Sequence, residues 1–334
     1  MTIPRNQLIN VADTPYYHCI SRCVRQAFLC GKDKHSGQSF EHRRGWIEDK
    51  LEELSSIFSI DICAYSIMHN HTHIIFFIDK DTATAWSDAE VIHRWHQLFS
   101  GTLLTQQYSR GEPIATYLQQ SLDETIACYR QRLIDISWFM RILNEGIARQ
   151  ANQEEGRKGR FWEGRFKSQA LLDEAALAAC MAYVDLNPIR ANIATTPETS
   201  AFTSIQQRIN AAKAAEQVKA LIESKQPKQL LPFAGNPRKN MPKGLPFDLK
   251  DYIALVDLTG RCIREDKVGY INPNELPILE RLNINEESWL SLTKNFTRIF
   301  HGAIGNPQTI TDYYHGKENT KRRPNLSPSK KLFA

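Results

Sequence analysis

Two histidines separated by one residue, His71 and His73, form the pattern in this sequence that is best suited to chemistry. They lie in an apolar run typical of a β-strand, where side chains at positions i and i+2 point to the same face. Both imidazoles can therefore bind one metal ion. Ile74, Phe76 and Ile78 face the other way and suit a buried core. The alternative is a pair of solvated histidines, because ten histidines are scattered through the chain.

A tyrosine and an asparagine in a predicted helix form the second candidate pair. Tyr183 and Asn187 are at positions i and i+4, so they share one helical face. A phenol oxygen can act as a nucleophile, and an amide oxygen can bind a hard metal ion. The alternative is a buried tyrosine and an asparagine that ends a helix. Pro188 disfavours helical geometry at Asn187, so the direction of the amide stays open.

These features occur in an order that resembles a known family. Residues 16–22 (YYHCISR), 71–73 (HTH), 160–163 (RFWE) and 183–188 (YVDLNP) follow one another as in the REP-associated tyrosine transposases. Those proteins belong to the single-tyrosine HUH superfamily of transposases and nucleases. The resemblance covers roughly residues 15–205, and it does not extend beyond about residue 210.

The resemblance implies a fold and a set of roles. The fold would be α+β, a ferredoxin-like antiparallel sheet with packed helices. By match to the motif, His71, His73 and Asn187 would bind Mg²⁺ or Mn²⁺, and Tyr183 would be the nucleophile. Its attack on DNA would give a covalent 5′-phosphotyrosine and a free 3′-OH, so rejoining needs no ATP. Thr72 departs from the bulky apolar residue usual at this place, and we expect reduced packing rather than loss of metal binding.

The partner that the resemblance implies is single-stranded, hairpin-forming DNA, the repetitive extragenic palindromes. Basic residues interleaved with aromatic ones fit this partner, because cations bind phosphates and rings stack on unpaired bases. Phe161 and Trp162 are alternatively the buried start of a strand. His18 shares a strand face with Arg22 and is either close to the site or a structural core histidine. The candidates for DNA contact are Arg22, Arg157, Lys158, Arg160, Trp162 and Arg165.

Three functions stay open at this stage. The first is a metal-dependent tyrosine transposase or single-strand DNA endonuclease. The second is a domesticated relative that binds DNA hairpins without cutting, although a pure binder has no need of the histidine pair with Tyr183 and Asn187. The third is a metal-dependent hydrolase that uses water and forms no adduct with DNA. The oligomeric state, monomer or dimer, stays open as well.

The elements that must position these residues follow from local patterns. The second and third predicted strands are joined closely and should form an antiparallel hairpin. The predicted strands are residues 16–22, 60–68, 71–78 and 161–172. The predicted helices are residues 39–58, 88–100, 173–185 and 201–224. An apolar seam with +4 and +3 spacing predicts further helix over residues 122–147, with a break near Ser137.

The resemblance, together with these local patterns, implies a domain plan. We expect a transposase domain at residues 15–205, with a helical insertion at about residues 80–158. A helix and a linker rich in proline and lysine would occupy residues 206–246. A small, mostly helical module would follow at residues 247–315, and then a basic, disordered tail at residues 316–334.

Composition excludes several classes of protein. The 334 residues are 42% hydrophobic and 24% charged, as in ordinary globular proteins, and no apolar run approaches the ~18 residues of a membrane span. The N-terminus lacks a signal-peptide pattern, so we expect a cytoplasmic protein, associated with the nucleoid when bound to DNA. Cys63, Cys128 and Cys180 should be reduced core residues. The net charge of +5 permits a polyanionic partner.

Overall fold

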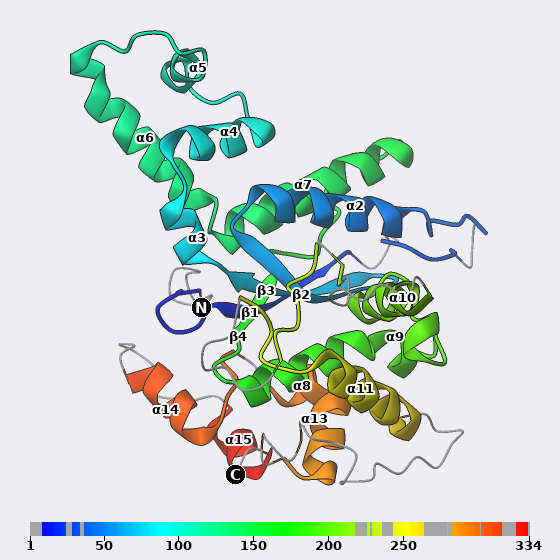
Figure 1. The fold of residues 1–334 in the computed structure, drawn as a ribbon. Coiled ribbons are helices and arrows are strands. Elements are labelled where there is room, and N and C mark those ends of the chain that lie inside the picture. The colour runs from blue at the N-terminus through cyan, green and yellow to red at the C-terminus, as the bar shows by residue number, and fades with distance from the viewer. Residues whose placement is uncertain are drawn as a thin grey trace. The chain divides into compact units, whose positions relative to one another are not determined.

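Four segments pair into one antiparallel sheet in the computed structural model of the chain (Figure 1). Their order across the sheet is β2-β3-β1-β4. One helix follows β1 and a series of helices follows β3, so the predicted ferredoxin-like α+β arrangement is confirmed. The strands are β1 (Tyr16–Arg22), β2 (Ile60–Ile67), β3 (His71–Ile78) and β4 (Lys167–Ala170).

Two compact units make up the chain. The sheet unit comprises Met1–Gly45, Ile62–Phe77 and Arg160–Ala334. The helical unit comprises Trp46–Asp61 and Ile78–Gly159. The structure describes residues 9–24, 29–33, 37–217, 226–227, 229–235, 243–263, 279, 282, 284–300, 302–315 and 325–332.

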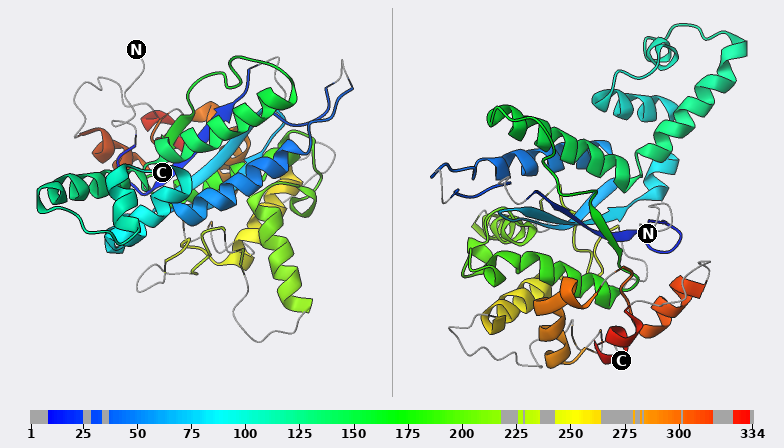
Figure 2. Two further views of the ribbon diagram at one scale, coloured as in Figure 1. Left: turned by 90° about the horizontal axis from the view of Figure 1, so that it is seen from above. Right: turned by 180° about the vertical axis from the view of Figure 1, so that it is seen from behind.

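Helices supply most of the remaining structure, and Figure 2 shows them from two further sides. Helix α2 (Arg43–Ile57) begins in the sheet unit and continues in the helical unit. The sheet unit also contains α8 (Glu174–Asp185), α9 (Asn187–Arg190), η2 (Pro197–Thr199), α10 (Ser204–Gln217), α11 (Leu249–Ile263), α13 (Glu286–Ile299), α14 (Pro307–His315) and α15 (Leu326–Leu332). The helical unit contains α3 (Lys80–Ala85), α4 (Asp88–Leu98), α5 (Leu103–Ser109), η1 (Thr116–Leu118), α6 (Gln119–Arg132) and α7 (Ile136–Glu154). In the part of the chain that the structure describes, no helix is both long and apolar enough to cross a membrane.

The register of the sheet places both histidines of the pair on one face. Strand β1 pairs antiparallel with β3 so that Arg22 is opposite His71 and Ile20 is opposite His73. It pairs antiparallel with β4 so that His18 is opposite Gln169. Because side chains alternate along a strand, all of these residues point to the same side of the sheet.

The other face of β3 is buried as well. Ile74, Phe76 and Ile78 are almost completely buried, as their alternation with the histidines predicts. Thr72, the residue between the histidines, is only 2% exposed. A β-branched threonine is therefore accommodated within the core on this face.

The predicted strand at residues 161–172 is wrong in its first half. Only β4, at its end, pairs with β1, and Trp162 forms an isolated bridge with Cys23. Between them the backbone bends, and the Arg160 guanidinium donates hydrogen bonds to the Trp162 and Glu163 carbonyls. These side-chain bonds offer the backbone an alternative to a continuous strand ladder.

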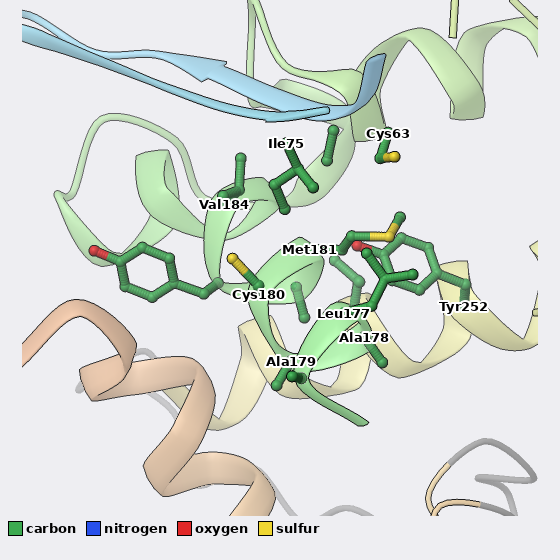
Figure 3. Packing of buried hydrophobic residues seen from close by; sticks show 14 of the residues in the cluster. Cys63, Ile75, Leu177, Ala178, Ala179, Cys180, Met181, Val184 and Tyr252 are labelled. Atoms are coloured by element: carbon green, nitrogen blue, oxygen red, sulfur yellow. The ribbon is translucent and has the colours of Figure 1, made fainter. Parts of the chain in front are cut away.

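Helix α8 lies against the sheet face that carries the histidines. Asp173 caps it by accepting a hydrogen bond from the Ala176 amide at 2.8 Å, which confirms the predicted helix start. Every residue from 176 to 185 is buried. Figure 3 shows Val184 and Met181 of this helix packed among residues of one core cluster that includes Ile75. The small alanines let the helix approach its neighbours closely.

The C-terminal region belongs to the same core. Helix α13 packs against α8, and Trp289, Phe296 and Phe300 are fully buried in the cluster that holds α8. In the stretch predicted as a linker, Leu230 forms a bridge with Ile62. The prediction of a disordered tail is wrong for residues 326–332, which form α15 and pack against α13 and α14. The Asn325 amide anchors that helix by donating to the Ala303 carbonyl. The remaining tail residues lie outside the described part of the chain.

The helical unit follows the predicted apolar seam. The break near Ser137 is confirmed, because α7 starts after Asp135, whose carboxylate accepts a hydrogen bond from the Ser137 amide at 2.6 Å. Cys128 is exposed, which corrects its assignment to the core. It lies on α6 between the buried Ile126 and Tyr129, off the apolar stripe of the helix.

A buried carboxylate fixes the end of α8. Asp185 is fully buried and accepts hydrogen bonds from the Ser204 hydroxyl at 2.5 Å, the Ile205 amide at 3.1 Å and the Tyr252 hydroxyl at 2.7 Å. Burial raises the pKa of this carboxyl to about 6, and the hydrogen bonds and the positive charge of Arg208 oppose that rise. The network joins the C-terminal end of α8 to α10 and α11, so it fixes the position of that end within the sheet unit.

Replacing Asp185 with alanine tests this anchor. The change leaves the Ser204 and Tyr252 hydroxyls without their acceptor and removes the charge that offsets Arg208. We expect the free energy of unfolding at pH 7, measured by urea denaturation, to fall by ~3 kcal/mol or more. The matched control is Asp257→Ala, which removes only a surface ion pair with Arg261 and should cost less than ~1 kcal/mol. Equal losses for the two variants would contradict the anchoring role.

Candidate active site

The imidazole pair lies at the start of β3 in the sheet unit. The ring centroids of His71 and His73 are 4.9 Å apart, with the ring planes at 79°. His73 is 3% exposed, and His71 at the end of the strand is partly exposed. The pair is thus reached from one end of the sheet while its inner member is surrounded by protein.

Each imidazole of the pair uses one ring nitrogen in a hydrogen bond. Nδ1 of His71 is 2.7 Å from Oδ1 of Asn70, and Nδ1 of His73 is 2.9 Å from Nε2 of His18. Nδ1 of His18 in turn is 2.8 Å from Oε1 of Gln169. Among the described residues, Nε2 of His71 and Nε2 of His73 have no hydrogen-bond partner.

Burial keeps these histidines uncharged near neutral pH. It lowers the pKa of His18 to about 4, against a smaller opposite effect of the bond to Gln169. Burial, with the charges of Arg22 and Arg190, lowers the pKa of His71 to about 4. The pKa of His73 is lowered well below its usual value, mainly by burial and then by its histidine neighbours. Neutral imidazole is the form that binds metal ions.

Tyr183 is brought beside this pair by α8. Its ring centroid is 5.5 Å from that of His73, and the two planes meet at 81°. The tyrosine ring stacks on Phe296 at 5.5 Å, and the Arg190 guanidinium carbon is 4.2 Å from its centroid. Its hydroxyl is 2.8 Å from Oγ1 of Thr297. The side chain is therefore held on several sides, and the residue is 4% exposed.

Asn187 joins the group through an arginine. Helix α8 ends at Leu186, and Asn187 begins the short helix α9. Its Oδ1 accepts a hydrogen bond from Arg190 at 3.2 Å, while its buried Nδ2 has no partner in the described part of the chain. Arg190 thus contacts both Tyr183 and Asn187 and acts electrostatically on both histidines. The described contacts include no direct bond between Asn187 and either histidine.

The predicted DNA-contact residues fall into two groups. Arg22, Arg160, Trp162 and Arg165 belong to the sheet unit, whereas Arg157 and Lys158 belong to the helical unit. Arg22 is opposite His71 in the sheet, and its backbone carbonyl accepts a hydrogen bond from the Glu163 amide at 2.8 Å. The bend that contains Arg160 and Trp162 therefore runs beside the end of β1 nearest the histidine pair. Arg165 is exposed, Trp162 is partly buried, and Phe161 is buried at 4% exposure.

Sequence reasoning missed four residues of this site, namely Gln169, Arg190, Phe296 and Thr297. Arg190 follows Tyr183 by two helical turns, so helical spacing could have indicated it. Gln169 lies opposite His18 only once the strand pairing is known. Phe296 and Thr297 come from a region without a recognisable motif, and Thr297 is 114 residues from Tyr183 in the chain. No local signal could have placed these two in the site.

Comparison with known proteins gives a distant likeness of fold. No protein-family model and no curated protein matches the chain. Among solved structures, one match covers 70% of this chain and 100% of the other, at 11% sequence identity. Its TM-score is 0.36, too low to bear on function. That structure is of a REP-associated tyrosine transposase bound to a REP hairpin.

Proposed function

We propose that this chain is a metal-dependent tyrosine transposase of the single-tyrosine HUH type, an endonuclease that cuts and rejoins single-stranded, hairpin-forming palindromic DNA in the cytoplasm. The observation that carries the proposal is the pair of His71 and His73, whose Nε2 atoms have no hydrogen-bond partner among the described residues, with the Tyr183 ring 5.5 Å from that of His73. A histidine pair and a tyrosine side by side supply a metal site and a nucleophile.

The residues present fit a divalent cation. His71 and His73 offer neutral imidazoles with a free ring nitrogen, and Asn187 offers an amide oxygen that has a second lone pair. The buried Nδ2 of Asn187 has no partner among the described residues; it is a hydrogen-bond donor and suits an acceptor such as a phosphate oxygen. No cluster of three His, Cys, Asp or Glu side chains among the described residues could hold a metal. An ion here would therefore use Asn187, and nitrogen ligands suit Mn²⁺ at least as well as Mg²⁺.

Neutral ligands suit phosphoryl chemistry. When bound, the ion would offset the charge of a non-bridging phosphate oxygen. Two imidazoles and an amide leave its positive charge uncompensated for that purpose. Arg190, whose guanidinium lies against Tyr183 and Asn187, adds a further positive charge where a phosphate would approach the phenol.

The covalent step conserves bonds and electrons. The Tyr183 oxygen forms a bond to phosphorus while the bond between phosphorus and the 3′-oxygen breaks, and the phenol proton is transferred to that oxygen. The products are a 5′-phosphotyrosine and a free 3′-OH, and attack by a 3′-OH reverses the step. To react, the Tyr183 hydroxyl must exchange its hydrogen bond with Thr297 for a contact with the phosphate.

The basic bend next to the pair supports single-stranded DNA as the substrate. Nε of Arg22 lies 4.0 Å from Oε2 of Glu163, and both side chains are exposed. Because solvent screens this ion pair, a phosphate can compete with Glu163 for Arg22. Arg165 is exposed and Trp162 is partly exposed, which allows contacts to phosphate and stacking on an unpaired base. Arg157 and Lys158 are further candidates for DNA contact, on the helical unit.

A second candidate function is hairpin binding without cleavage. The observation that favours it is the engaged state of Tyr183, whose hydroxyl bonds to Thr297 and whose ring is buried. A titration with hairpin DNA that saturates, while no cleavage appears with Mg²⁺ or Mn²⁺, would support this function. Cleavage without a protein–DNA adduct on a denaturing gel would instead support a hydrolase that uses water.

The substitution Tyr183→Phe separates these functions. Loss of the hydroxyl should reduce cleavage of a single-stranded hairpin with Mn²⁺ by at least ~1,000-fold and abolish the covalent adduct on a denaturing gel. Hairpin affinity should change little, because the ring and its packing remain. Tyr117→Phe, at an exposed position of the helical unit, is the matched control and should cut normally. Undiminished cleavage by Tyr183→Phe would exclude this nucleophile.

The pH dependence of metal binding tests the state of the histidines. Since the pKa of His71 is lowered to about 4, protons should not compete for its ring nitrogen until the pH falls well below 6. Calorimetric titration should give a nearly constant Mn²⁺ affinity from pH 7.5 to 5.5 and a steep loss below pH 5. A tenfold loss between pH 7 and 6 would show ordinary, exposed histidines.

The substitution His71→Ala identifies the ligand itself. It should reduce Mn²⁺ affinity by more than the ~10–100-fold typical of residues that only support a ligand, and abolish cleavage. Much of the hairpin affinity should persist, because DNA binding rests on other residues. His93→Ala, at an exposed histidine of the helical unit, is the control. Equal loss of metal binding and hairpin binding by His71→Ala would indicate a structural role.

A further inference from the structure

A chain of hydrogen bonds connects the end of α13 to one histidine of the pair. The Gln169 amide donates from Nε2 to the Phe300 carbonyl at 2.8 Å. Oε1 of Gln169 lies 2.8 Å from Nδ1 of His18, and Nε2 of His18 lies 2.9 Å from Nδ1 of His73. Gln169, His18 and Phe300 are 7%, 0% and 0% exposed, so water does not interrupt the chain.

The donor and acceptor of each bond follow from the Phe300 carbonyl at the start of the chain. A backbone carbonyl can only accept, so Gln169 must present its NH₂ group to Phe300 and its oxygen to His18. That oxygen can only accept, so Nδ1 of His18 carries the proton. His18 is fully buried and contacts no carboxylate among the described residues that could offset a charge, so its ring is neutral and Nε2 accepts.

The last bond then determines the tautomer of His73. Because Nε2 of His18 accepts, Nδ1 of His73 must carry the proton and donate. A neutral imidazole has only one N–H, so Nε2 of His73 keeps its lone pair. This nitrogen has no hydrogen-bond partner among the described residues, and it is the one proposed above to bind a metal ion. The other tautomer would place a proton where a metal ion has to bind.

We propose that His18 and Gln169 are positioning residues that hold His73 in its metal-binding tautomer, and that the C-terminal region completes the site by anchoring Gln169 through the Phe300 carbonyl. The metal-binding part of this inference rests on the proposed function, whereas the tautomer of His73 does not.

The hydrogen-bond chain from the Phe300 carbonyl through Gln169 and His18 to His73 is called the relay below. Other contacts of α13 connect the C-terminal region to the candidate site independently of this relay. The Phe296 ring lies 6.4 Å from the His18 ring and 5.5 Å from the Tyr183 ring. Thr297 bonds to the Tyr183 hydroxyl. Phe296 and Thr297, in the helical turn before Phe300, therefore contact both His18 and the candidate nucleophile Tyr183. A region with no motif of its own thus contributes to the site in two separate ways.

The test reads the tautomer directly. Nitrogen NMR of the full-length protein labelled with ¹⁵N-histidine distinguishes a protonated from an unprotonated ring nitrogen, and His73→Ala identifies the His73 signals. The wild-type protein should show a protonated Nδ1 and an unprotonated Nε2 at His73. The variant Gln169→Leu, which removes the acceptor for His18, should give a mixture of both tautomers. Its Mn²⁺ affinity should fall by ~10–100-fold.

A matched variant controls for the loss of a glutamine that bonds to a backbone carbonyl. Gln226 also donates to a phenylalanine carbonyl, that of Phe233, but takes no part in the relay. Gln226→Leu should leave both the His73 signals and the Mn²⁺ affinity unchanged.

Two results would overturn the relay: a protonated Nε2 at His73 in the wild type, which needs no variant to fold, or unchanged His73 signals in Gln169→Leu. If the wild type neither binds Mn²⁺ nor cuts DNA, the proposed function fails, and the tautomer still decides whether the relay exists.

Discussion

Burial of the histidine-bearing face of the sheet is the constraint on which the candidate site depends. A charged imidazole at His18 or His73 would lose its hydration shell without a compensating charge, so both rings stay neutral. A neutral imidazole has one donor and one acceptor, and leaving either unpaired in the core costs ~1–3 kcal/mol. The buried relay satisfies both nitrogens of His18 but only one of His73. The remaining nitrogen of His73 has no partner among the described residues, and an unsatisfied polar group in a buried setting calls for a functional explanation.

Helix α8 holds Tyr183 more firmly than a loop would hold a tyrosine. Alanines along α8 let it lie close to the strands and to α13, and Asp185 ties its end to α10 and α11. Tyr183, two residues before that anchor, therefore has little freedom in its backbone. Rigid elements hold reacting groups in a defined geometry better than loops do. Asn187 begins α9 after the break at Leu186, and its Oδ1 accepts a hydrogen bond from Arg190 of the same short helix.

Local periodicity was sufficient for the parts of the site that lie on regular elements. The alternation around His71 and His73 predicted β3 and its inward face, and Asp173 predicted the start of α8. The prediction of a strand from residue 161 failed because the Arg160 side chain satisfies backbone carbonyls that a strand would pair. The contacts of Gln169 and Thr297 could not be predicted, since they depend on partners 131 and 114 residues away. Patterns within a few turns carry no information about such pairs.

The hydrogen bond between Tyr183 and Thr297 is compatible with both cleavage and simple binding, and its energy explains why. A neutral hydrogen bond contributes only ~1 kcal/mol net, and a bond to a charged phosphate oxygen contributes ~1.5–3 kcal/mol. Exchange of the threonine for a phosphate would therefore favour the reactive arrangement without moving the ring from Phe296 and Arg190. The bond to Thr297 keeps the buried hydroxyl satisfied, and it is weak enough to be given up if a phosphate group competes for that hydroxyl. A buried, engaged phenol is thus no argument against its use as a nucleophile, provided that the phosphate can reach it.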